Sequence, residues 1–195
     1  GKKRPGVCVQ QDDFSRILEV YLKADYVLMA APLYVFGFPA PVKNVIDRFF
    51  ITLQPAQVKS SQGFSVHPKR WPRHPKAVLI SSCGFPEIEK FDLLRNHFRL
   101  ICQQMDWQQA GDLLIPASGC AHAPKLFNRK YQLLKEAGAE LRDDRISAKT
   151  AAQVAAPVMD EEDYRRMSTA NFQKGILAKL KRSMLAVKAV RRLEK

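Results

Sequence analysis

A short apolar run, a loop and an amphipathic segment with helical spacing follow one another three times along this chain. The apolar runs are residues 26–31 (YVLMAA), 76–81 (KAVLIS) and 112–116 (DLLIP), and the helical segments after them are residues 41–50, 91–105 and 126–137. Strands that are buried on both faces of a parallel sheet read as continuous apolar runs. The alternation therefore predicts an α/β fold with a doubly wound parallel sheet.

The length and charge of the chain fit one such domain with a helical extension. The chain has 195 residues, 46% of them hydrophobic, and a net charge of +13. Residues 174–195 contain eight Lys and Arg and one Glu, so this tail supplies seven of the 13 net charges. We expect a sheet domain over residues 1–158 and a basic, helical C-terminal extension over residues 159–195.

The cysteines and the apolar stretches indicate in which cellular compartment the protein is expected. Cys8, Cys83, Cys102 and Cys120 form no close pair, which fits a reducing compartment better than a disulfide framework. The most hydrophobic stretch, residues 27–42, contains three prolines and is too short to span a bilayer. No secretory leader is recognised. These observations favour a cytoplasmic protein.

Two loops leave the expected strands with unusual composition, where open parallel sheets bind their ligands. Residues 31–40 carry Tyr34, Phe36 and Gly37 between prolines, a surface on which a flat heteroaromatic ring can stack. The same aromatic side chains can instead cap the core beneath the next helix. Residues 82–87 begin with small residues, which let backbone amides approach a ligand closely. Cys83 in this loop is more typical of a buried hydrophobe than of a nucleophile, because no Cys/His/Asn set accompanies it.

The region around the first loop resembles a known family. The paired aspartates Asp12 and Asp13 are followed by residues 24–34 (ADYVLMAAPLY) and by residues 42–48 (VKNVIDR). These resemble the "ADxxxxxxPxY" and "LKxxxDR" motifs of the NADPH-dependent FMN reductase branch of the flavodoxin-like proteins, which includes the iron–sulfur flavoproteins. Val42 stands where the motif has Leu. The similarity extends over about residues 6–172.

The resemblance implies a flavodoxin-like fold, FMN as cofactor, and NADPH or NADH as electron donor. Hydride would pass from the nicotinamide to FMN and onward to a small-molecule acceptor, in a homodimer. Because the flavin carries this chemistry, no catalytic acid or base and no metal ligand is predicted. The implied cofactor-binding residues are Pro32, Leu33, Tyr34, Val35, Phe36 and Gly37 on one loop and Ser82, Cys83, Gly84 and Phe85 on the other. Lys43, Asp47 and Arg48 are expected to anchor the helix and a dimer contact.

The chain departs from the family pattern at its beginning. The family's first strand, phosphate-binding loop, helix and second strand have no counterpart here, so we expect an incomplete sheet whose strand at residues 26–31 lacks a neighbour. The amides that would cradle the FMN phosphate are missing with them. Family members often carry further cysteines near Cys8, so an iron–sulfur cluster is expected only if upstream cysteines exist.

The long segment of residues 54–75 and the C-terminal tail leave alternatives open. His67, Arg70, Trp71, Arg73 and His74 could bind NADPH near the flavin, or the segment could be an ordinary solvated loop. The tail, residues 172–195, has an apolar stripe of Leu177, Leu180, Met184 and Val187. It should dock on its own domain, with a partner chain or an anionic membrane surface as the alternatives. No specific nucleic-acid motif accompanies its charge.

Two rivals to the oxidoreductase hypothesis follow from the same residues. One is a flavodoxin-like electron-transfer protein that takes electrons from a reductase and not from a nicotinamide. The other is a truncated, non-catalytic relic that binds partners through its exposed strand and tail.

Overall fold

The computed structural model of the chain describes residues 4–60 and 63–193, without the side chains of residue 122 and residues 178–193. The chain forms two compact units, Gly1–Ala156 and Pro157–Lys195. The elements of the first unit are α1 (Phe14–Lys23), β1 (Tyr26–Pro32), α2 (Ala40–Arg48), η1 (Phe49–Thr52), β2 (Val58–Lys59), β3 (Ser65–Val66), β4 (Lys76–Ser82), η2 (Ile88–Phe91), α3 (Asp92–Met105), β5 (Gln109–Ile115), η3 (Ser118–His122), α4 (Pro124–Glu140), η4 (Leu141–Asp143) and α5 (Ala148–Ala155). The domain boundary expected after residue 158 stays a prediction.

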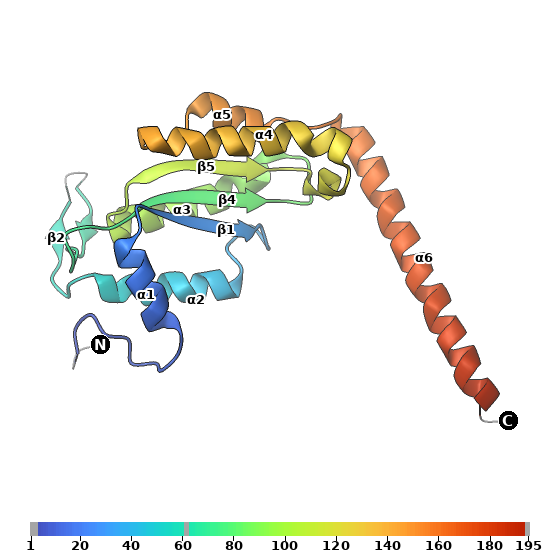
Figure 1. Cartoon of the computed structure of the whole chain (residues 1–195), viewed down its shortest axis with the longest axis horizontal. Coiled ribbons are helices and arrows are strands. Elements are labelled where there is room, and N and C mark those ends of the chain that lie inside the picture. Colours follow the sequence, from blue (N-terminus) through green and yellow to red (C-terminus); the bar gives the residue numbers. More distant parts are fainter. Residues whose placement is uncertain (1–3, 61–62, 194–195) are drawn as a thin grey trace. The chain divides into compact units, whose positions relative to one another are not determined.

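The main sheet is parallel, with strand order β1-β4-β5. Tyr26 pairs with Lys76 at one end of the β1–β4 ladder and Pro32 with Ser82 at the other. Each strand is joined to the next by a helical crossover, as Figure 1 shows. This arrangement confirms the predicted α/β fold with a parallel sheet. Among the described residues, β1 has a strand partner on one side only.

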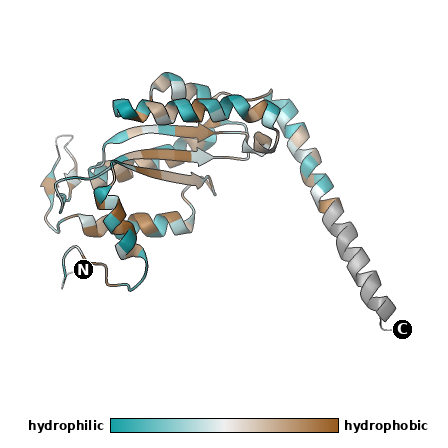
Figure 2. Ribbon diagram, in the orientation of Figure 1, coloured by the Kyte–Doolittle hydropathy of each residue, from teal (hydrophilic) through white to brown (hydrophobic). Residues whose placement is uncertain are grey.

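Helices cover both faces of the sheet, α1 and α2 on one side and α4 and α5 on the other (Figure 1). The first face holds the larger core cluster, to which α1, α2, η1 and α3 contribute together with β1, β4 and β5. Figure 2 shows hydrophobic residues concentrated on the three strands between these layers. Leu28, on the opposite face of β1 from the core residue Met29, is 53% exposed. The helices of the second face therefore cover β4 and β5 more completely than β1.

Local sequence explains where the helices begin and end. Pro39 and Pro41 flank the first residue of α2, where their fixed φ suits a helix start and their missing N–H costs nothing. The predicted apolar face of this helix is buried at Ile46 and Phe49. Helix α3 ends at Met105, and its C-cap Asp106 adopts a left-handed φ of 51°. Of its residues at the predicted helical spacing, Leu94, Phe98 and Met105 are buried and Ile101 is half-buried.

The structure differs from the sequence patterns at three places in the first unit. The segment of residues 54–75 includes a short antiparallel hairpin of β2 and β3. Helix α5 packs against β5 and α4. Strand β5 begins three residues before the predicted run, at Gln109.

The second unit contains one helix, α6 (Glu161–Leu193). It begins eleven residues before the predicted tail helix, and its first turns carry the ion pairs Arg165–Glu161 and Arg166–Glu162. The predicted stripe falls mostly on Leu180, Met184 and Val187, whose side chains lie outside the described residues. Leu177 is 57% exposed. None of the described helices combines the length and the apolar character that crossing a membrane requires.

Candidate functional site

The two loops predicted to bind the cofactor lie side by side. They leave the neighbouring parallel strands β1 and β4 at the same level, where Pro32 pairs with Ser82. The ladder continues one step further, because the Leu33 N–H donates to the Ser82 carbonyl oxygen at 2.8 Å. The two loops are thus joined by main-chain hydrogen bonds at the carboxyl edge of the sheet, where α/β proteins bind ligands.

The first loop is a tight turn from Tyr34 to Gly37. The Gly37 N–H donates to the Tyr34 carbonyl at 3.1 Å and the Tyr34 N–H to the Gly37 carbonyl at 3.3 Å. Val35 and Phe36 between them both have left-handed φ values, 47° and 63°. Two successive left-handed residues are typical of a type I′ turn, which favours Asn and Gly at these positions. A β-branched residue there is a true conformational outlier, of the kind that concentrates at functional sites.

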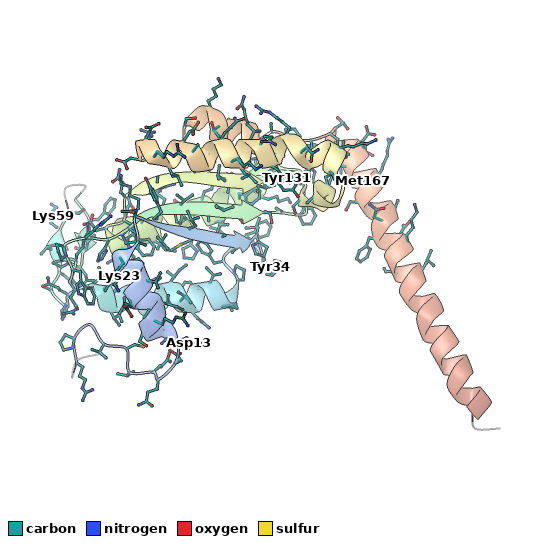
Figure 3. The ribbon with its side chains drawn as sticks, viewed as in Figure 1. Asp13, Lys23, Tyr34, Lys59, Tyr131 and Met167 are labelled. Carbon is teal, nitrogen blue, oxygen red and sulfur yellow. The ribbon has the colours of Figure 1, made fainter. Side chains whose placement is uncertain are left out.

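The turn presents its side chains to solvent. Val35 is 95% exposed, Tyr34 62% and Phe36 48%. Figure 3 shows Tyr34 beyond the carboxyl end of β1, pointing away from the sheet. Because exposed aromatic rings gain by stacking on a flat ligand, this turn has the chemistry of a ring-binding surface and does not cap the core.

The second loop is held by the end of β5 and the residues that follow it. The Cys83 N–H donates to the Ile115 carbonyl at 3.0 Å, and the Ala117 N–H donates to the Phe85 carbonyl at 2.8 Å. Phe85 is 62% exposed, whereas Cys83 is only 5% exposed and belongs to the core cluster. The prediction that Cys83 lines the cofactor is therefore limited to its backbone, because its side chain packs inward.

The predicted residues of both loops lie at the carboxyl edge of the sheet, and they differ in how far they are exposed to solvent. The exposed members are Pro32, Tyr34, Val35, Phe36, Gly84 and Phe85; Leu33, Gly37 and Ser82 are half-buried. A Cβ added to Gly84 would meet no atom within 4 Å, so space remains next to its backbone. A flat heteroaromatic ring such as that of FMN fits this surface of three aromatic side chains and accessible backbone.

Sequence reasoning missed one residue of this surface, Lys90. It lies in η2, and its Nζ is 5.3 Å from the ring centroid of Phe85 and 5.9 Å from that of Phe36. The ammonium thus lies over rings from both loops. Its place nine residues after the expected strand end at Ser81, just beyond the second loop, was the available signal, but nothing in the spacing links it to Phe36.

The basic residues of the long segment lie at the other end of the sheet. Arg73 pairs with Asp25 at the start of β1. Together with His74, Lys76 and Arg142 it lines a groove of about 410 Å³ next to Tyr26. Burial lowers the pKa of His74. A seven-residue strand is about 23 Å long, so Arg73 and His74 do not lie beside this chain's own flavin loops, which contradicts the alternative that they bind NADPH there within one chain.

Two other candidate NADPH-binding residues, Arg70 and His67, make contacts within the protein. Arg70 Nη2 donates to the Leu53 carbonyl at 2.9 Å and its Nε to the Ile51 carbonyl at 3.2 Å. The His67 ring contacts Phe50 edge-on, with 5.1 Å between centroids. These contacts tie the segment to the residues after α2.

The motif residues of α2 form ion pairs. Lys43 pairs with Asp47 one turn later on α2. Arg48 donates to both carboxylate oxygens of Asp12, at 2.6 and 2.7 Å, and its Nη2 donates to Cys8 Sγ at 3.2 Å. The hydrogen bond from Arg48 lowers the pKa of the Cys8 thiol. Arg48 thus holds the segment before α1 against the end of α2, which agrees with an anchoring role for the motif.

Metal-ligating side chains do not gather in the described part of the chain. No three His, Cys, Asp or Glu side chains there are placed to hold one ion. Cys83, Cys102 and Cys120 are buried free thiols.

Sequence comparison matches the first part of the chain to a known family. Residues 1–85 match the sequence model of the family described as NADPH-dependent FMN reductase. This confirms the family resemblance over a span that contains α1, β1, α2, β4, the first loop and the start of the second, shorter than the expected span of residues 6–172. No curated protein matches the chain.

Several solved structures are similar to the chain. The Trp repressor binding protein from Bacillus subtilis is 27% identical, with 55% of this chain and 60% of that one covered and a TM-score of 0.40. An FMN-dependent NADH-azoreductase from Bacillus anthracis, solved in complex with FMN, is 14% identical, with 80% and 61% covered and a TM-score of 0.41. A flavone reductase is 14% identical, with 83% and 50% covered and a TM-score of 0.42. The chain spans about half to three fifths of the length of these structures.

Proposed function

We propose that the chain is the flavin-binding part of an FMN-dependent NAD(P)H oxidoreductase. The observation that carries the proposal is the pair of adjoining loops after β1 and β4, which exposes Tyr34, Phe36 and Phe85 at one edge of a parallel sheet. The predicted cofactor-binding residues of both loops lie within the residues that match the NADPH-dependent FMN reductase family.

In this function the protein binds and orients the flavin ring, and bound FMN supplies the capacity to accept and pass on hydride or electrons. Phe36 and Phe85 offer faces for stacking, and the backbone beside Gly84 is accessible to the polar edge of the ring. Lys90 supplies a positive charge between the two loops. The buried Cys83 keeps the second loop packed on the core.

The proposal also covers the electron donor, the electron acceptor and the oligomeric state. The family description supports NADPH as donor, with NADH as the alternative, and a small molecule as acceptor. A homodimer would add a wall over the open aromatic surface, and light scattering on the purified chain would measure the oligomeric state. Four free cysteines support a cytoplasmic location.

Flavin retention tests the binding step. The chain is incubated with FMN and desalted, and its absorbance spectrum is recorded; fluorescence titration then gives the Kd. Replacing Phe36 or Phe85 by Ala should weaken FMN binding about two- to tenfold each, as expected for the loss of about 0.5–1.5 kcal/mol of ring stacking. Phe64→Ala removes an exposed ring, 55% accessible, in the segment that follows β2 and should leave the Kd unchanged. Equal Kd values for all four proteins would contradict the proposed site.

Anaerobic reduction separates the oxidoreductase from an electron-transfer protein. The oxidoreductase hypothesis expects NADPH or NADH to bleach the bound flavin directly. Bleaching by dithionite but by neither nicotinamide would favour the electron-transfer protein.

A further inference from the structure

Lys90 has an unusual environment within the proposed site. It follows the second loop directly, in the short helix η2, and its side chain is half-buried. Its Nζ lies 5.3 Å from the Phe85 ring and 5.9 Å from the Phe36 ring. Among the ion pairs of the described residues, none involves Lys90.

Contact with two ring faces does not neutralise the charge of Lys90. A cation over an aromatic ring is attracted to the ring's quadrupole, but the ring carries no net charge. Lys43 and Lys76, by contrast, each face a carboxylate. The positive potential at Lys90 is therefore available to an anionic ligand at the aromatic surface.

The position of Lys90 suits the edge of a flat ligand. A ring that stacks on Phe36 or Phe85 comes within reach of the ammonium, because the flexible four-carbon stem lets it move from the ring faces to the ligand. Its partial burial shields the interaction from screening by salt.

We infer that Lys90 binds the reduced, anionic flavin more tightly than the oxidised, neutral ring and thereby raises the reduction potential of the bound cofactor. The inference rests on the proposed function. A hydride from the nicotinamide brings two electrons and one proton to the ring and leaves an oxidised nicotinamide; without a second proton, the reduced ring carries one negative charge. Lys90 is a positioning and charge-compensating residue for that anion, and it donates no proton to it.

Two substitutions separate charge from packing. Lys90→Met keeps an unbranched side chain against the two rings and removes the charge, whereas Lys90→Arg keeps the charge and the cation–π contacts. Lys59→Met removes an exposed lysine from β2, which Figure 3 shows at the end of the sheet away from Tyr34. This variant controls for the change in net charge.

The experiment measures the Kd of oxidised FMN and the reduction potential of the bound flavin for the four proteins. Lys90→Met should lower the preference for reduced over oxidised flavin about tenfold, which for a two-electron couple is a decrease of about 30 mV. Lys90→Arg and Lys59→Met should keep the wild-type potential. An unchanged potential in Lys90→Met with FMN still bound would overturn the inference and leave the proposed function standing. Failure of the wild-type chain to bind FMN would overturn both.

Discussion

The turn from Tyr34 to Gly37 should be locally strained, and replacing Val35 by Asn should relieve part of that strain. An L-residue in the left-handed region costs about 1–2 kcal/mol, and Asn tolerates this region far better than a β-branched residue. Val35 has a φ of 47° and is 95% exposed, so its replacement loses almost no buried apolar surface. We expect Val35→Asn to raise the free energy of unfolding by about 1 kcal/mol and the melting temperature by about 2–4 °C.

Urea denaturation followed by tryptophan fluorescence measures this difference, because Trp107 lies in the core cluster. Val9→Asn is the matched control. Val9 is also an exposed loop valine, 82% accessible, and it is not among the residues with positive φ. A surface substitution of this kind should change stability by less than about 0.5 kcal/mol.

The reasoning would be refuted if Val35→Asn were no more stable than the wild type while Val9→Asn stayed neutral. The left-handed conformation would then cost the folded chain little free energy, and the turn would not be strained. A gain in stability together with weaker FMN binding would instead indicate that the apolar side chain is kept for the ligand at the expense of stability.

Three further predictions concern the core and its buried polar groups. Tyr21→Phe should cost about 1–3 kcal/mol in urea denaturation, because the buried Trp107 Nε1–H donates to Tyr21 Oη at 2.6 Å and would lose its acceptor. Gly111→Ala should cost about 1–3 kcal/mol by the same measurement, since φ is +147° and a Cβ would lie 2.8 Å from Ile146 Cβ. Burial lowers the pKa of Lys130 to about 8, so between pH 8 and about 10 the unfolded chain binds more protons than the folded chain. The stability of the wild type relative to Lys130→Met should therefore rise with pH across that window, as measured by melting temperature.

Each of these predictions has a contrary outcome. Gly138→Ala, in α4 with no atom within 4 Å of the added Cβ, should stabilise by up to about 1 kcal/mol, so equal effects at Gly111 and Gly138 would contradict the steric argument. Tyr21→Phe with wild-type stability would mean that Trp107 finds another acceptor. A difference between wild type and Lys130→Met that is independent of pH would show that Lys130 is not buried as described.

The three strand–helix units could be predicted because each combines a buried apolar run with a helix of clear spacing. Strands β1 and β4 extend only one residue beyond their predicted ends, at Pro32 and Ser82. Helix α5 was missed although Ser147 caps it, accepting a hydrogen bond from the Thr150 N–H. Its segment, AKTAAQVA, has too few large apolar residues to show an amphipathic pattern.

The sequence predicted which two loops form the candidate site, but it did not predict which of their side chains are exposed. Composition and family resemblance pointed to the correct segments, and strand order brought them together. The sequence predicted Cys83 to be a buried hydrophobe, but it could not show that Phe85 two residues later points outward, because alternation along a strand gives no guide beyond its end. Lys90 was missed for a related reason: its contact with Phe36 depends on the crossover that places η2 beside the first loop.

The hydrogen bond from Leu33 to Ser82 has a consequence for how this surface can change. Because the bond joins two backbones, the spacing of the loops does not depend on which side chains they carry. Substitutions at Tyr34, Phe36 or Phe85 can then alter the shape and polarity of the surface without moving the frame that holds it. A library randomised at these three positions should consequently contain a high proportion of folded members, and new ligand preferences could arise there in single steps.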